Sequence, residues 1–172
     1  MERSLRNLLF VAAALFFQSM VFGQTQVGPI VAEANGISFS LTIRGARAEV
    51  TVSAPVTGWV AVGFNPTSRM KDADFKIGYI KDGTVFARDD FGTGLITHGD
   101  DTRVGGTADL ISFSGNEKDG RTTVTFIFPV DSKDTKDAVL TKGAHTIILG
   151  SSNSDSFTGI HNKIGKATIA IP

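Results

Sequence analysis

Apolar and polar residues alternate along most of the chain, and this alternation predicts strands. In residues 37–43, with the sequence ISFSLTI, every second side chain is large and apolar, so one face of a strand carries all of them. Residues 58–64, with the sequence GWVAVGF, are apolar almost throughout, which indicates a central strand buried on both faces. Comparable strand patterns recur at 74–80, 84–90, 109–114, 121–130, 144–150 and 165–171. About ten short strands at this spacing predict an all-β fold, an antiparallel β-sandwich.

The segments between the predicted strands have the composition of turns. Asp82 and Gly83 form a strong hairpin signal, and residues 116–120 indicate a second hairpin. The chain has 19 glycines, which fits many tight turns. Only residues 132–140 hint at a turn of helix, and no segment between the strands has the composition of a linker. We therefore expect residues 24–172 to form a single domain.

Residues 1–23 differ from the rest of the chain. Two arginines precede the apolar run 8–17, and Gly23 closes the segment with a small residue. This order is typical of a secretory signal peptide. A membrane-spanning helix needs about 20 apolar residues, and Gln18 interrupts this run too early. We expect cleavage after Gly23, a secreted or periplasmic protein, and no integral membrane segment in the mature chain.

The composition of the mature chain excludes several classes of function. The full chain has 17 basic and 17 acidic residues, and loss of Glu2, Arg3 and Arg6 leaves 15 and 16, a formal net charge of −1. Without a basic stripe, nucleic acid is not an expected partner. The chain has no cysteine, which excludes disulfides, thiolate zinc sites, iron–sulfur clusters and covalently attached c-type haem.

A methionine in the loop after the central strand is the first candidate for chemistry. Met1 and Met20 belong to the signal segment, so Met70 is the only methionine of the mature chain. It lies in a polar loop between Arg69 and Lys71. A loop methionine often folds back to fill a gap in a core. Its thioether is also a soft ligand, and a Met/His pair on haem iron raises the reduction potential, which suits electron transfer.

Three histidines are candidate partners for Met70. His161 lies in a loop just before the last predicted strand, a position from which a side chain can line a pocket. His145 lies inside a strand, and we expect it to be half-buried. His98 lies in a loop rich in glycine and aspartate, and we expect it to be solvated. These positions favour His161 without placing it next to Met70.

Residues 58–91 resemble the central part of DOMON domains. The resemblance rests on a strand with tryptophan that ends in Gly-Phe, a loop methionine, a small residue before aspartate, a Gly-Tyr strand and a short turn. In this chain these features are Trp59, Gly63-Phe64, Met70, Ala73-Asp74, Gly78-Tyr79 and Asp82-Gly83. His161 and Gly165 match a late histidine before the last strand of the family. The resemblance spans roughly residues 30–171.

Haem-binding DOMON domains use the loop methionine and the late histidine as axial ligands, which implies Met70 and His161 here. Some relatives have lysine in place of the histidine, so Lys163 is a further candidate. Trp59, Phe64 and Phe75 are expected to supply the apolar slot for a non-covalent haem b. Cations for the propionates are available at Arg69, Lys71 and Lys163. With both axial positions filled, the iron would exchange electrons with a redox partner protein and bind no substrate.

The resemblance also leaves a second function open, because some DOMON domains bind sugars or other ligands without haem. An exposed aromatic platform would favour that alternative, but the only Trp and the only Tyr both lie in apolar strands. Independent catalysis is not expected, because no G-x-S-x-G or H-E-x-x-H motif occurs. The Asp-Asp pairs at 89–90 and 100–101 are interpreted as structural or solvated rather than as a calcium site.

Overall fold

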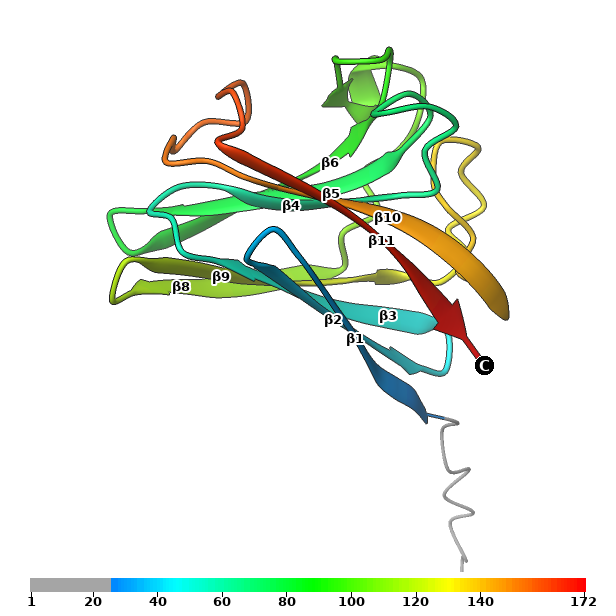
Figure 1. The fold of residues 1–172 in the computed structure, drawn as a ribbon. Helices are drawn as coiled ribbons and strands as arrows, with labels where there is room; N and C mark the ends of the chain where they lie inside the picture. The colour runs from blue at the N-terminus through cyan, green and yellow to red at the C-terminus, as the bar shows by residue number, and fades with distance from the viewer. Residues whose placement is uncertain (1–25) are drawn as a thin grey trace, which may run out of the picture.

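The computed structural model describes residues 26–172, which form two antiparallel sheets packed face to face (Figure 1). The five-stranded sheet has the order β1 (Gln26–Ala34), β2 (Ile37–Arg44), β3 (Arg47–Ala54), β9 (Arg121–Pro129) and β8 (Ser112–Lys118). The six-stranded sheet has the order β11 (Lys163–Ile171), β10 (Gly143–Ser151), β4 (Val60–Phe64), β5 (Asp74–Lys81), β6 (Thr84–Phe91) and β7 (Gly99–Asp100). The predicted antiparallel β-sandwich is confirmed, with eleven strands in place of about ten.

The structure shows which face of the sheet each side chain of β4 occupies. In β4, Val60, Val62 and Phe64 face the space between the sheets, while Ala61 and Gly63 face outward. The predicted central strand is indeed internal, because β4 lies between β10 and β5. All five residues of β4 are buried, on the inner face by the core and on the outer face by the side chains of Trp59, Phe75 and Ile77.

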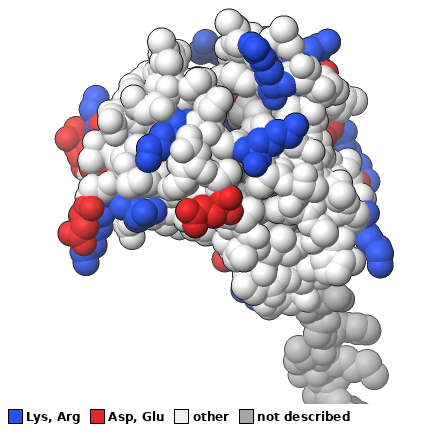
Figure 2. All heavy atoms as spheres, in the orientation of Figure 1, with Lys and Arg blue, Asp and Glu red and all other residues white. Residues whose placement is uncertain are grey.

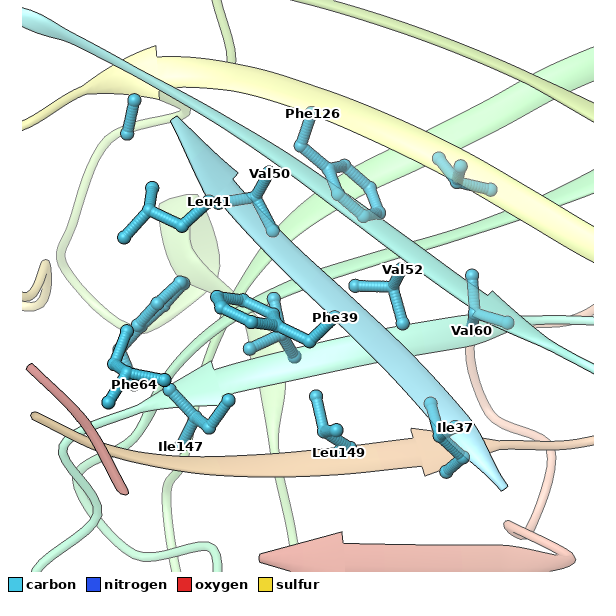
Figure 3. Close-up of a cluster of buried hydrophobic side chains, with 14 of the residues drawn as sticks. Ile37, Phe39, Leu41, Val50, Val52, Val60, Phe64, Phe126, Ile147 and Leu149 are labelled. Carbon is cyan, nitrogen blue, oxygen red and sulfur yellow. The ribbon is translucent and has the colours of Figure 1, made fainter. Parts of the chain in front are cut away.

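Apolar side chains from both sheets fill the space between them (Figure 3). Phe64 lies at the centre of an aromatic group, with its ring centroid 6.2 Å from that of Phe39 and 5.9 Å from that of Phe128. Burial of each such side chain contributes about 1.5–3 kcal/mol to folding. In a chain without disulfides, this core must provide most of the stability.

The helical turn expected at 132–140 is not formed. This segment crosses from one sheet to the other as irregular chain, and side chains of the sheet hold it in place. The Ala138 amide donates to Asp74 in β5 at 3.1 Å, and the Leu140 amide donates to the Val130 carbonyl at 2.8 Å. These bonds satisfy backbone groups that a helix would have paired internally, so tertiary contacts override a weak local preference.

The predicted signal peptide lies outside the described residues. Within residues 26–172, no helix has the length and apolar character needed to cross a bilayer. Figure 2 shows lysine, arginine and acidic side chains dispersed singly or in small groups over the visible face, with no continuous basic stripe there.

Candidate functional site

A cavity of about 780 Å³ opens on the outer face of the six-stranded sheet. Its floor is formed by β4, β5 and β10, and its walls come from loops on two sides of that face (Figure 1). One wall contains residues 69–70 and 95–98, and the opposite wall contains residues 158–161. The volume falls within the range of about 300–1,000 Å³ that is usual for sites of small molecules and cofactors. Both Met70 and His161 line this cavity.

The floor of the cavity is flat because its central positions carry the smallest side chains. Ala61 pairs with Gly150 across β10, and Gly63 lies two residues further along β4. A Cβ atom at Gly63 would lie 2.5 Å from the Phe75 ring, and one at Gly150 would lie 3.0 Å from the Trp59 ring. These glycines allow the two aromatic rings to lie against the sheet. The result is a floor suited to a planar ligand.

Trp59 contributes both surface and a free polar group. Trp59 is 95% buried, packs with Ala61 and Ile77, and lines the cavity. The indole Nε1–H is buried and has no hydrogen-bond partner among residues 26–172. A buried donor without a partner costs about 1–3 kcal/mol, so a bound ligand with an acceptor oxygen would remove that cost.

A tight turn positions Met70. The Thr67 amide donates to the Lys71 carbonyl at 2.9 Å, and the Met70 amide donates to the Leu95 carbonyl at 3.4 Å in the neighbouring loop. Gly92 packs so closely on this turn that a Cβ atom there would overlap the Met70 carbonyl oxygen. Two hydrogen-bonded loops therefore hold the methionine backbone at the rim of the floor.

Backbone and side-chain bonds on both sides of His161 fix its loop. The Ser152 hydroxyl donates to the Ile160 carbonyl at 2.7 Å, and the Asn162 amide donates to the Ser151 carbonyl at 2.7 Å. The Trp59 amide donates to the Ser154 carbonyl at 3.1 Å, which ties the same loop to the start of β4. Hydrogen bonds therefore hold the loop of His161 in place, although the residue itself is exposed.

Two residues expected in the site lie elsewhere. Phe64 is fully buried between the sheets, because it stands five residues from Trp59 and so faces the opposite side of the sheet. Lys163 also faces away from the cavity, with its Nζ near Gly36 in the turn between β1 and β2. Lys166, three residues further along β11, lines the cavity in its place. Trp59 and Phe75 line the cavity as expected.

His98 is a site residue that the sequence did not reveal. It was expected to be solvated, yet it lines the cavity with a side chain only 21% exposed. Its Nδ1 lies 2.5 Å from an oxygen of Asp90, and its ring centroid lies 5.5 Å from that of Phe75. Arg88 binds the same carboxylate through both Nε and Nη2. Burial alone would raise the pKa of Asp90, but the hydrogen bonds from His98 and Arg88 outweigh burial and lower it.

Behind the cavity floor lies a buried ionic cluster that the sequence also did not reveal. Lys76 is fully buried on the core side of β5, and its Nζ lies 2.6 Å from Asp74, 2.5 Å from Asp89 and 3.3 Å from Asp137. The three carboxylates are close enough together to suit a metal ion. The ammonium group at their centre supplies the positive charge that an ion would provide, so we assign the cluster a structural role. It joins β5, β6 and the crossover segment 132–140.

Carboxyl groups in and near this cluster have displaced pKa values. Burial raises the pKa of Asp89 to about 7 despite the adjacent Lys76, and burial raises that of Asp137 to about 6. Asp101 is 99% buried, and neither of its carboxylate oxygens has a hydrogen-bond partner among the described residues. Burial, together with the charges of Asp134 and Asp137, raises its pKa to about 7.

These raised pKa values predict that the protein is most stable in mild acid. A carboxyl group whose pKa is higher in the folded than in the unfolded chain favours folding most at low pH, where it is protonated in both states. That contribution decreases as the pH rises from about 4 through 7. Asp90 and Asp134 have lowered pKa values, and their contribution is lost only as the pH falls below about 4. We expect the free energy of unfolding to be larger at pH 5 than at pH 8.

Urea unfolding followed by the fluorescence of the single tryptophan measures this dependence. Asp101→Asn should reduce the difference between pH 5 and pH 8, whereas Asp119→Asn, in the exposed turn after β8, should leave it unchanged. A free energy of unfolding that rises from pH 5 to pH 8 would contradict the prediction.

The fold is a β-sandwich with a cavity on the outer face of one sheet. The DOMON domain family model matches residues 33–151, and the chain belongs to this family. No curated protein sequence matches the chain significantly.

Solved structures that share the fold include two cytochrome domains. One is the cytochrome b domain of pyranose dehydrogenase from Coprinopsis cinerea, with a TM-score of 0.60, 11% identity, and coverage of 78% of this chain and 76% of that chain. The other is the cytochrome domain of cellobiose dehydrogenase from Myriococcum thermophilum, with a TM-score of 0.55, 11% identity, and coverage of 87% and 82%. At this identity the likeness concerns the fold, and the ligand of this chain has to be argued from its own residues.

Proposed function

We propose that this protein is a secreted or periplasmic b-type cytochrome that binds one non-covalent haem between Met70 and His161 and transfers electrons. The observation that carries the proposal is that both candidate axial ligands line one cavity, although 90 residues separate them in the chain. They approach it from loops on different sides of the same sheet face. The two structural neighbours, which are cytochrome domains, support the same assignment.

The lining of the cavity fits haem in three respects. Its floor is flat and apolar, with small residues at the centre and Phe75 and Ile77 beside them. The indole donor of Trp59 lacks a partner and suits an acceptor oxygen. Arg69 and Lys166 lie at the lining and can balance the charge of propionates. This combination of an apolar body and a few polar anchors is usual for cofactor sites.

The contribution of the protein would be to hold the cofactor and set its chemistry. Bound haem supplies a single-electron carrier, and thioether together with imidazole ligation favours its reduced form. Met70 and His161 would hold the haem iron as its two protein ligands. Trp59, Phe75 and Ile77 would exclude water from the cofactor face. Electrons would then pass to and from a partner protein, and we do not propose independent catalysis.

Absorption spectroscopy tests the proposal directly. The protein, exported to a periplasm and supplied with haem, should show the sharp α and β bands of a six-coordinate low-spin haem after reduction by dithionite. His161→Ala should lose six-coordination, because no other imidazole lies on that wall of the cavity within residues 26–172. Met70→Ala should lose the weak long-wavelength band of ferric iron bound to methionine sulfur. A folded protein that refuses haem would overturn the proposal.

A second candidate function is a ligand-binding module without haem, and one observation favours it. Tyr79 stacks on Phe86 with centroids 5.1 Å apart and contacts Phe157 at 4.9 Å, while Phe86 is 39% exposed. This aromatic group continues the Trp59 wall of the cavity outward. Aromatic surfaces of this kind bind the apolar faces of sugars. Binding in a glycan screen, lost in Tyr79→Ala and retained by haem-free protein, would favour this function.

A further inference from the structure

The surroundings of the His98 side chain resemble those of a histidine that binds a metal. Histidines that bind metals commonly donate their other ring N–H to a carboxylate, which fixes both the tautomer and the ring orientation. Here the Nδ1 of His98 lies 2.5 Å from Asp90, a residue 99% buried. Arg88 contacts both oxygens of that carboxylate, one at 2.7 Å, and keeps it ionised.

The ionised partner decides which nitrogen of His98 is free. A carboxylate can only accept hydrogen bonds, so Nδ1 must be the protonated nitrogen and the donor. In the neutral imidazole this leaves Nε2 with its lone pair. Nε2 has no hydrogen-bond partner among residues 26–172, and it is not sealed inside the protein. Because His98 lines the cavity, Nε2 is the atom available to a group bound there.

The other two histidines do not combine a carboxylate partner with a place on the Met70 side of the cavity. His145 uses both nitrogens, with Nδ1 3.1 Å from the Asn65 amide nitrogen and Nε2 2.7 Å from the Thr141 carbonyl. It is buried and does not line the cavity. His161 lines the cavity from the opposite loop. His98 is therefore the one described histidine that is oriented by a carboxylate and also lies on the Met70 side.

Met70 and His98 lie on loops that are bonded to each other. The Met70 amide donates to the Leu95 carbonyl, the Asp72 amide donates to Gly92 at 2.9 Å, and the Gly92 amide donates to Ala73 at 2.8 Å. A short turn, closed by a bond from the Gly94 amide to the Thr97 carbonyl at 3.2 Å, then leads directly to His98. The thioether and the imidazole thus belong to one wall, opposite His161.

We propose that His98 is a reserve iron ligand, which binds through Nε2 in place of Met70 whenever the methionine sulfur leaves the iron. The proposal rests on the proposed function, since it needs haem in the cavity. Asp90 acts as a positioning residue, because it holds the ring through Nδ1. Replacement of the thioether by a second imidazole would lower the reduction potential, since Met/His ligation raises it. Departure of the Met70 thioether from the iron would then change the driving force for electron transfer without removing a protein ligand from the iron.

Spectra of four haem-loaded proteins test this proposal: wild type, His98→Ala, Met70→Ala and the double variant Met70→Ala/His98→Ala. Wild type and His98→Ala should both keep the band of methionine-bound ferric iron. Met70→Ala should lose that band yet remain six-coordinate and low-spin, with the electron paramagnetic resonance spectrum of two imidazole ligands. The double variant should become high-spin. Adding His145→Gln to Met70→Ala should leave the low-spin spectrum unchanged and serves as the matched control.

Two results would overturn the proposal. If Met70→Ala and the double variant have the same high-spin spectrum, His98 does not reach the iron. If wild type binds haem without the methionine band and His98→Ala becomes high-spin, His98 is the resident ligand and not the reserve. Failure of every protein, wild type included, to bind haem is a different result, which overturns the proposed function together with this inference. Circular dichroism of each variant before haem is added shows that it is folded.

Discussion

Replacement of Lys76 by methionine is expected to lower the free energy of unfolding by about 3–5 kcal/mol at neutral pH. The ammonium group is fully buried and contacts Asp74, Asp89 and Asp137, and it is the only cation among these carboxylates within residues 26–172. Methionine fills a similar volume but leaves three carboxyl groups in the core without a counter-charge. Burial would lower the pKa of Lys76, but the three carboxylates raise it well above its ordinary value, so the ammonium group stays charged at pH 7.

Urea unfolding of Lys76→Met beside Lys81→Met measures this effect. Lys81 ends the same strand and is exposed, so its replacement should change the free energy of unfolding by less than about 0.5 kcal/mol. The loss in Lys76→Met should shrink at pH 5, where protonation removes part of the uncompensated charge. Addition of Asp89→Asn to Lys76→Met should recover part of the loss at pH 7. An unchanged unfolding midpoint in Lys76→Met would show that the cluster contributes nothing to stability.

Filling the cavity floor is expected to weaken haem binding by about 100-fold and leave the fold intact. Ala61→Phe adds a phenyl ring at the centre of the floor, where β4 lies between β5 and β10. The cavity of about 780 Å³ has room for that ring when no ligand is present. A ligand would then overpack the site, which would cost about 3 kcal/mol of binding free energy. This corresponds to a loss of affinity of roughly 100-fold.

Ala170→Phe is the matched control for this variant. Ala170 is exposed on the outer face of the same sheet, in β11, and lies outside the cavity. Haem titration followed by absorption should give wild-type affinity for Ala170→Phe and a loss of about 100-fold for Ala61→Phe. Equal affinities for the two variants would show that haem does not occupy this cavity.

The sequence predicts the sandwich well because strand alternation is a local property. The resemblance to DOMON domains pointed to Trp59, Met70 and His161, and all three line the cavity. The error at Phe64 was avoidable in principle, since residues five positions apart on one strand point to opposite faces. Lys163 differs, because the face it occupies depends on where β11 begins, and strand boundaries are poorly determined by sequence.

The remaining site residues depend on pairing between distant segments. Asp89 and Asp90 are adjacent and were interpreted as structural or solvated. In the structure, alternation sends Asp89 to the Lys76 cluster and Asp90 to His98. The register that places Asp89 opposite Lys76 belongs to the hairpin of β5 and β6. Asp137 reaches the cluster from a crossover segment with no regular structure. No periodic pattern in a sequence reports such contacts, which is why these groups appeared only in the structure.

The ends of the described chain lie at the pole away from the loop of His161. β11 starts beside that loop and runs nine residues, or about 30 Å, to Ile171. β1 packs beside it, with Ala34 against Gly165, and its first residue lies at the same pole as Ile171 (Figure 1). A protein tethered to a bead, an electrode or a fused enzyme through Pro172 would therefore keep the mouth of its cavity turned toward the surrounding solution.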